Sequence, residues 1–115
     1  MPISQTLINK YIESIRNEVA QMTKLEQQIA EGQDRYSVGR ALGKLVMETS
    51  DERYSIMHGF EITDEIKKEL KARNKKLDLL LGEIGSPIHQ GYNDFLKENS
   101  VVEKWVKRST NGSGK

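Results

Sequence analysis

Apolar residues in the first quarter of the chain recur at alternating spacings of four and three residues, which keeps them on one face of a helix. They are Ile8, Ile12, Ile15, Val19, Met22, Leu25 and Ile29. Ile12 and Val19 are one heptad apart, and Glu26 interrupts the row that they begin. The apolar face therefore resembles the seam of a coiled coil at first and then moves to a neighbouring position on the helix. The pattern predicts a helix from about residue 3 to residue 30, with Gly32 as its stop.

This first helix is long for a chain of 115 residues. At 1.5 Å per residue it would run about 42 Å, whereas a compact domain of this size would be about 35 Å across. We therefore expect part of the helix to project or to meet another subunit. On this interpretation the residues at the protein interface are Ile8, Ile12, Ile15, Val19 and Met22.

The stretch from residue 36 to residue 62 fits two structures. Read as helix, it places Val38, Leu42, Leu45, Val46 and Thr49 on one face, and Thr49 to Glu52 forms a capping box that would open a further short helix. Read as strand, Tyr54 to Ile62 alternates between apolar and other residues, and a turn at 50–53 would pair it with 45–48. We favour the helix and keep a central β-hairpin at about 42–62 as the alternative.

The second half of the chain carries clearer helix signals. Thr63 is a good N-cap, and acidic residues at 64 and 65 suit the positive end of a helix dipole. A helix from about Asp64 to Glu83 is expected, with Gly85 as its stop and Pro87 at the first position of the next helix. The apolar stripe of the helix at 64–83 consists of Ile66, Leu70, Leu77, Leu80, Leu81 and Ile84.

Together these elements predict an all-α fold, a small antiparallel helical bundle with a long coiled-coil-like first helix. The alternative fold is α+β, with the central hairpin. We expect one helical domain over residues 1–108, followed by a disordered tail at 109–115 because that stretch is small and polar.

Composition and charge narrow the function classes. Eighteen basic against 17 acidic residues leave a net charge of +1, so no global basic field draws the chain to DNA. The chain has no cysteine, which excludes disulfides, thiol nucleophiles and cysteine-ligated metals. No secretory signal and no apolar run long enough to span a bilayer are present, so we expect a cytoplasmic protein that does not enter membranes.

Familiar catalytic and cofactor motifs are absent. The run Gly39 to Lys44 has three residues between its glycines and lacks the hydroxyl residue of a phosphate-binding loop; its glycines suit the close approach of another helix. His58 and His89 lack the converging partners that a metal site needs. We therefore expect no catalytic residues, no metal, no cofactor, no small-molecule substrate and no enzymatic activity.

One helix face is strongly basic. Lys67, Lys68, Lys71 and Lys75 project on the side opposite the apolar stripe of their helix, where they could contact phosphates. No aromatic residue interleaves with them to stack on bases. A solvated lysine face is the simpler interpretation, and a nucleic-acid contact is the alternative.

Two further features suggest contacts. Arg73 projects into its own apolar stripe, where it would extend to the edge of the stripe, pair with an acid of the first helix or face a partner. We favour a pair with Glu26, which would fix the register of the two helices. Trp105, in a short final helix, either covers the core or contacts a partner.

These observations favour a non-enzymatic interaction protein, such as an adaptor, small assembly subunit or regulator. We expect it to form a homo-oligomer or to bind a protein partner through its amphipathic helices. The rival function is that of a nucleic-acid-binding accessory protein that uses the lysine face.

Overall fold

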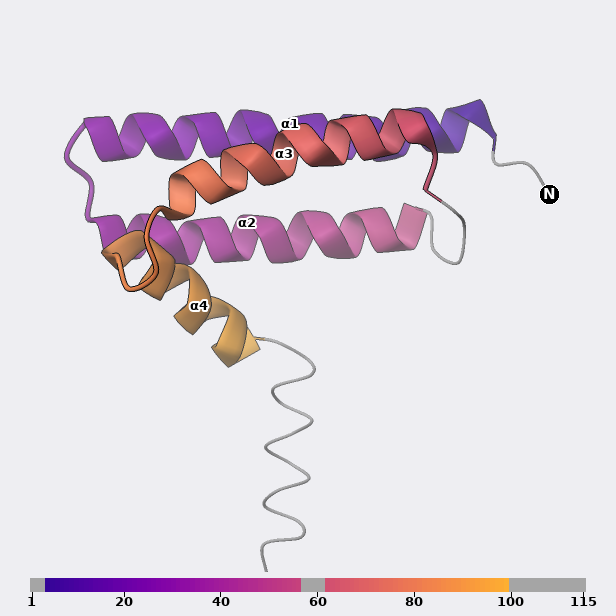
Figure 1. The fold of residues 1–115 in the computed structure, drawn as a ribbon. Coiled ribbons are helices and arrows are strands. Elements are labelled where there is room, and N and C mark those ends of the chain that lie inside the picture. The colour runs from indigo at the N-terminus through magenta and orange to yellow at the C-terminus, as the bar shows by residue number, and fades with distance from the viewer. Residues whose placement is uncertain (1–3, 57–61, 100–115) are drawn as a thin grey trace, which may run out of the picture.

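The computed structural model describes residues 4–56 and 62–99, and within them every regular element is an α-helix. The helices are α1 (Gln5–Ala30), α2 (Arg35–Ile56), α3 (Asp64–Leu81) and α4 (Pro87–Asn99). Figure 1 shows α1 and α2 running antiparallel, α3 lying along α1, and α4 crossing the N-terminal part of α2. The predicted all-α bundle of antiparallel helices is therefore confirmed.

Side chains at the helix starts satisfy backbone N–H groups that the helices leave unpaired. Ser4 and Thr63 accept hydrogen bonds from the backbone of residues three positions later, each at 3.2 Å, which confirms the predicted cap at Thr63. Before α2, Asp34 accepts hydrogen bonds from Ser37 N–H and Oγ at 2.9 and 2.8 Å. These donors lower the pKa of the Asp34 carboxyl because they favour its charged form.

The central hairpin is wrong for residues 42–56, because α2 runs unbroken through them. The helix predicted to begin at Thr49 is also wrong, since Thr49 lies inside α2 and its Oγ1 donates to the Leu45 carbonyl oxygen at 2.8 Å. His58 and the rest of 57–61 lie outside the described residues. Tertiary packing explains the continuity, because Val46, Thr49 and Arg53, which lie on both sides of the expected break, are all buried in α2.

Backbone-to-backbone contact joins α2 to α4, as the two glycines one turn apart had indicated. A Cβ atom on Gly39 would lie 2.1 Å from the carbonyl oxygen of Ile88 in α4. From the other side, a Cβ atom on Gly91 would lie 2.2 Å from the carbonyl oxygen of Tyr36 in α2. Only glycine lets the two helices approach this closely.

Polar side chains hold the outer edge of the same crossing. Tyr36 Oη donates to Asp94 Oδ2 at 2.6 Å, and Arg40 donates two hydrogen bonds to the Glu98 carboxylate at 2.7 and 3.0 Å. The Arg40 guanidinium also lies 5.7 Å from the centre of the Phe95 ring. Hydrogen bonding to Asp94 raises the pKa of Tyr36, because it favours the protonated phenol.

The apolar core consists of two clusters. The larger one joins all four helices and comprises Met22, Leu25, Val38, Leu42, Val46, Leu77, Leu80 and Ile88. The smaller one joins α1 to α3 and comprises Ile8, Ile12, Ile15 and Ile66. Along α1 the two clusters meet at Glu18, which is itself fully buried.

Gly39→Ala should destabilise the protein by more than about 2 kcal/mol, because its methyl group would overlap the α4 backbone and force the helices apart. Gly43→Ala is the matched control, since its Cβ would lie 3.1 Å from Phe95 Cβ and 3.2 Å from the Tyr92 carbonyl oxygen, a tight contact without the overlap found at Gly39. There the gain of about 1 kcal/mol in helix propensity offsets the crowding. Urea unfolding followed by circular dichroism measures both, and equal stabilities would contradict the close approach.

Candidate functional site

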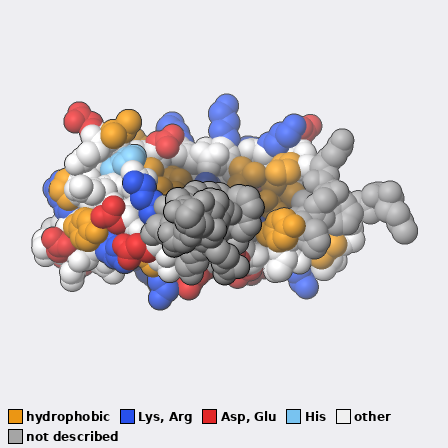
Figure 2. All heavy atoms as spheres, turned by 90° about the horizontal axis from the view of Figure 1, so that it is seen from below, with side chains coloured by type: hydrophobic (Ala, Val, Ile, Leu, Met, Phe, Trp, Pro, Cys, Tyr) orange, Lys and Arg blue, Asp and Glu red, His pale blue; other side chains and the backbone are white. Residues whose placement is uncertain are grey.

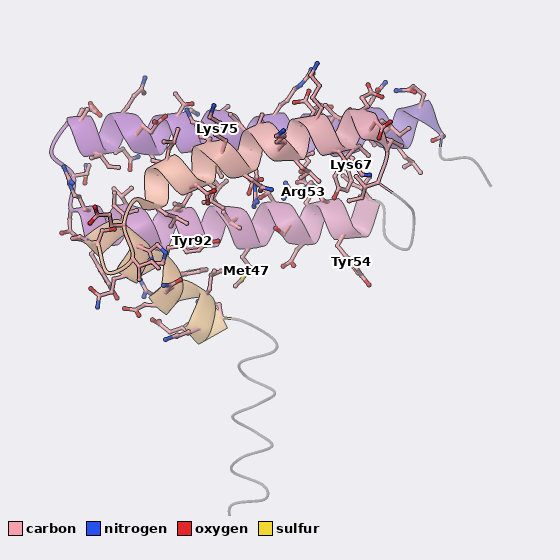
Figure 3. All side chains as sticks on the ribbon, viewed as in Figure 1. Met47, Arg53, Tyr54, Lys67, Lys75 and Tyr92 are labelled. Atoms are coloured by element: carbon pink, nitrogen blue, oxygen red, sulfur yellow. The ribbon has the colours of Figure 1, made fainter. Side chains whose placement is uncertain are left out.

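A buried carboxylate binds two arginines at the centre of the bundle. Arg53 Nη1 and Arg73 Nε both donate to Glu18 Oε1 at 2.9 Å, and Arg73 Nη2 donates to Glu18 Oε2 at 3.1 Å. Figure 3 shows Arg53 pointing from α2 into the space between α2 and α3. Glu18 and Arg53 are buried and Arg73 is largely so, which makes these interactions strong but costly to desolvate.

The three groups together carry a net charge of +1. Two further contacts help to stabilise this positive charge. Arg73 Nη1 donates a hydrogen bond to Asn74 Oδ1 at 2.6 Å, and the Arg53 guanidinium lies 6.0 Å from the centre of the Tyr11 ring. Since each partner comes from a different helix, the cluster fixes how α1, α2 and α3 are aligned. Its hydrogen bonds to the carboxylate are made within the chain, so we assign it a structural role.

The predicted pair of Arg73 with Glu26 is wrong. Arg73 pairs with Glu18, and Glu26 forms an exposed ion pair with Lys76. The reason is the register of the α1 seam. Tyr11, Glu18 and Leu25 follow one another at seven-residue intervals, and Glu18 and Leu25 are buried. Glu26 lies one position further round the helix and is exposed.

The α1 seam itself is buried within one chain. Ile8, Ile12, Ile15 and Met22 pack in the two core clusters, and Val19 is half-buried. This burial corrects the expectation that these residues face another subunit, since side chains of α2 and α3 pack with them in both clusters. A free interaction surface must therefore be sought elsewhere.

Such a surface lies at the end of the bundle where α3 turns into α4. A groove of about 500 Å³ opens there between the C-terminal end of α1, the start of α2 and the turn. Its apolar lining includes Ile29, Leu81, Pro87 and Ile88. Leu79 also lines the groove and is 74% exposed, and Ile84, next to the lining residue Glu83, is 90% exposed. We call Leu79, Ile84 and these four lining residues the end patch.

Local sequence builds the turn that presents Ile84. Gly82 follows Leu81 with φ of 66° and Gly85 has φ of 92°, conformations that glycine adopts without strain. Ser86 Oγ then donates to the Leu81 carbonyl oxygen at 2.9 Å and accepts from His89 N–H at 3.3 Å. The predicted start at Pro87 agrees with the described bounds of α4.

The end of α3 differs from the prediction in a way that matters for the end patch. The helix ends at Leu81, two residues before the expected Glu83. Ile84, assigned to the buried stripe by its spacing, therefore leaves the helical face and lies exposed in the turn. Figure 2 shows hydrophobic side chains at the molecular surface on the left, the side of the pale-blue histidine.

The end patch carries charges at its rim. Arg35, Glu83 and Glu26 line the groove, and Glu26 is paired with Lys76. Within the described part of the chain, no ion pair joins Arg35 or Glu83 to another residue. The rim therefore offers one positive and one negative group to whatever contacts the patch.

A second hollow lies between α1 and α2 and is mainly polar. Asn17 and Glu52 line both of its parts, whose volumes are about 290 and 450 Å³. Ser14 lines it too, and its Oγ is the one buried side-chain polar atom within residues 4–56 and 62–99 that lacks a hydrogen-bond partner. The lining has no strongly exposed apolar side chain that could anchor a partner.

The four predicted lysines share one exposed surface. Lys67, Lys68, Lys71 and Lys75 are all exposed on α3, and Figure 3 shows Lys67 and Lys75 on that helix. Among the described residues no ion pair neutralises them. Trp105 lies outside the described residues, so its predicted contact remains a prediction.

Two kinds of site are missing from the described residues. No group of three or more His, Cys, Asp or Glu within 4–56 and 62–99 could hold a metal ion. None of the helices in these ranges is long and apolar enough to cross a bilayer.

Comparison with known proteins found no match to a family model, to a curated protein or to a solved structure. The candidate sites are therefore judged by their own geometry.

Sequence reasoning missed Glu18, Arg53 and the end patch. Glu18 and Leu25 are seven residues apart, so the heptad pattern did place Glu18 in a row that becomes buried. Arg53 carries the same signal when 36–62 is read as helix, since it lies seven residues after Val46; for Leu79 no comparable signal exists, because the early end of α3 decides its surroundings.

Glu18→Leu should destabilise the protein by about 3 to 5 kcal/mol, because it leaves two guanidinium groups buried without their carboxylate. The triple variant Glu18→Leu, Arg53→Met and Arg73→Met should recover most of that loss, since it removes every buried charge at once. Glu26→Gln is the control and should cost less than about 1 kcal/mol, because its ion pair is exposed. Chemical unfolding measures all three, and a stable Glu18→Leu variant would show that the cluster is dispensable.

Proposed function

We propose that the chain is a non-enzymatic protein–protein interaction module whose contact surface is the end patch. The observation that carries this proposal is the exposure of Leu79 and Ile84 beside an apolar groove. Large apolar side chains that gather around a hollow with a polar rim are typical of the centre of a protein interface.

The packing of the bundle supports this assignment. The apolar face of α1 is buried in the core, so this helix offers little apolar surface to a partner. The end patch, by contrast, is built on rigid helix ends and a turn fixed by the Ser86 hydrogen bonds. A preformed surface loses little conformational entropy when it binds, which favours affinity from a small area.

The second candidate is a polyanion-binding accessory protein that uses the lysine face. The four exposed lysines span just over two turns of α3 without an ion pair among the described residues, which favours this function. Lysine ammonium groups can track a phosphate backbone, yet they read no base edges and give no sequence specificity. We rank this function second because a lysine face is also a common solvated surface.

A photo-crosslinking amino acid at position 84 tests the first function. In cells that make the protein, irradiation should give a discrete adduct at position 84 with an identifiable protein, including a second copy of this chain. Leu79→Asp should abolish the adduct because it places a charge in the apolar centre of the patch. The same crosslinker at the exposed Lys24 position is the control, and equal adducts from both positions would contradict the proposal.

The second function predicts binding of oligonucleotides that weakens steeply with salt, measured by fluorescence anisotropy. Replacing Lys67, Lys68, Lys71 and Lys75 by Gln should remove that binding and flatten its salt dependence. The matched control replaces the exposed residues Lys10, Lys24, Lys44 and Lys97 by Gln, which changes the net charge equally. If both variants lose binding alike, general charge and not the α3 face is responsible.

A further inference from the structure

We infer that the occupant of the end patch is a second copy of this chain, related by a twofold axis. The inference rests on the proposed function, because it names the partner of the same surface. It follows from two properties of the patch, its shape and its charge, and the size of the patch sets the strength that we expect.

The shape of the patch is self-complementary. Ile84 projects into solvent beside the groove, and Leu79 lies exposed on the lining of the groove together with Pro87. In a twofold contact, each surface supplies the same residues to the other, so a protrusion must lie next to the hollow that receives its counterpart. A groove of about 500 Å³ is large enough to accept both side chains.

The rim charges fit the same symmetry. Arg35, at the start of α2, and Glu83, in the turn after α3, both line the groove and carry opposite charges. A twofold axis that brings Arg35 to the partner's Glu83 also brings Glu83 to the partner's Arg35. Both rim groups then gain an opposite charge from one symmetry operation.

The size of the patch sets the expected strength. One end of a small bundle buries less than the usual area of about 800 Å² per partner, so the dimer should be weak, with a dissociation constant in the micromolar range or above. The purified chain should therefore change from monomer to dimer as its concentration rises.

Charge reversal tests the pairing. Arg35→Glu places two glutamates opposite each other at both ends of the contact, and Glu83→Arg likewise opposes two arginines. Each single variant should weaken dimerisation by at least about tenfold, because the twofold axis doubles each repulsion. An equimolar mixture of the two variants should associate within about threefold of the wild-type chain, since every contact in the mixed dimer joins opposite charges.

The measurement is light scattering on the purified full chain across a concentration series. Glu13→Arg and Lys24→Glu are the matched controls, because they reverse exposed charges on α1 away from the patch and should leave association unchanged. Thermal unfolding of each variant shows that the fold is retained.

Two outcomes would overturn the inference: a wild-type chain that stays monomeric at every concentration, or a mixture of variants that associates no better than either alone. Either result combined with a position-84 adduct to a different protein would leave the proposed interaction function standing. Loss of both the dimer and the position-84 adduct would remove the two proposals together.

Discussion

The arrangement of the bundle depends on one buried carboxylate. Glu18 binds Arg53 and Arg73, and these three side chains come from three different helices. Apolar packing alone tolerates small sliding of one helix against another, because many registers bury similar area. Directional hydrogen bonds to a charge with no access to water allow far fewer arrangements. The cluster therefore selects one alignment of α1, α2 and α3, at a desolvation cost that the apolar clusters on both sides must offset.

Local signals in the sequence were sufficient for most of the fold. Thr63 and Pro87 mark helix starts through chemistry that acts within one turn, so they could be recognised without knowing the rest of the molecule. The choice between Glu18 and Glu26 could not be made that way. Both lie close to the apolar arc of α1, and only the positions of the facing helices decide which one is buried.

The candidate site was harder to predict than the fold for a related reason. Helix ends shift by one or two residues with little local cost. The end of α3 at Leu81 moves Ile84 from a buried stripe to the surface and makes it the most exposed large apolar residue within the described ranges. Exposure of this kind depends on where α4 begins and how closely it packs on α2. The glycine contacts that set this distance suggest close approach in the sequence, but they do not name the facing residues.

Because Glu18 separates the two apolar clusters, the two parts of the core need not unfold together. The buried residues of the cluster around Ile15 and Ile66 come from α1 and α3, with Ile56 of α2 packed at its edge, whereas the other cluster ties all four helices together. Structural units of different contact density exchange their amide hydrogens at different rates. Backbone amides near the Thr63 end of α3 should therefore exchange through a smaller local unfolding event than those near Leu42. The ionic cluster of Glu18, Arg53 and Arg73 lies at the border between the two regions.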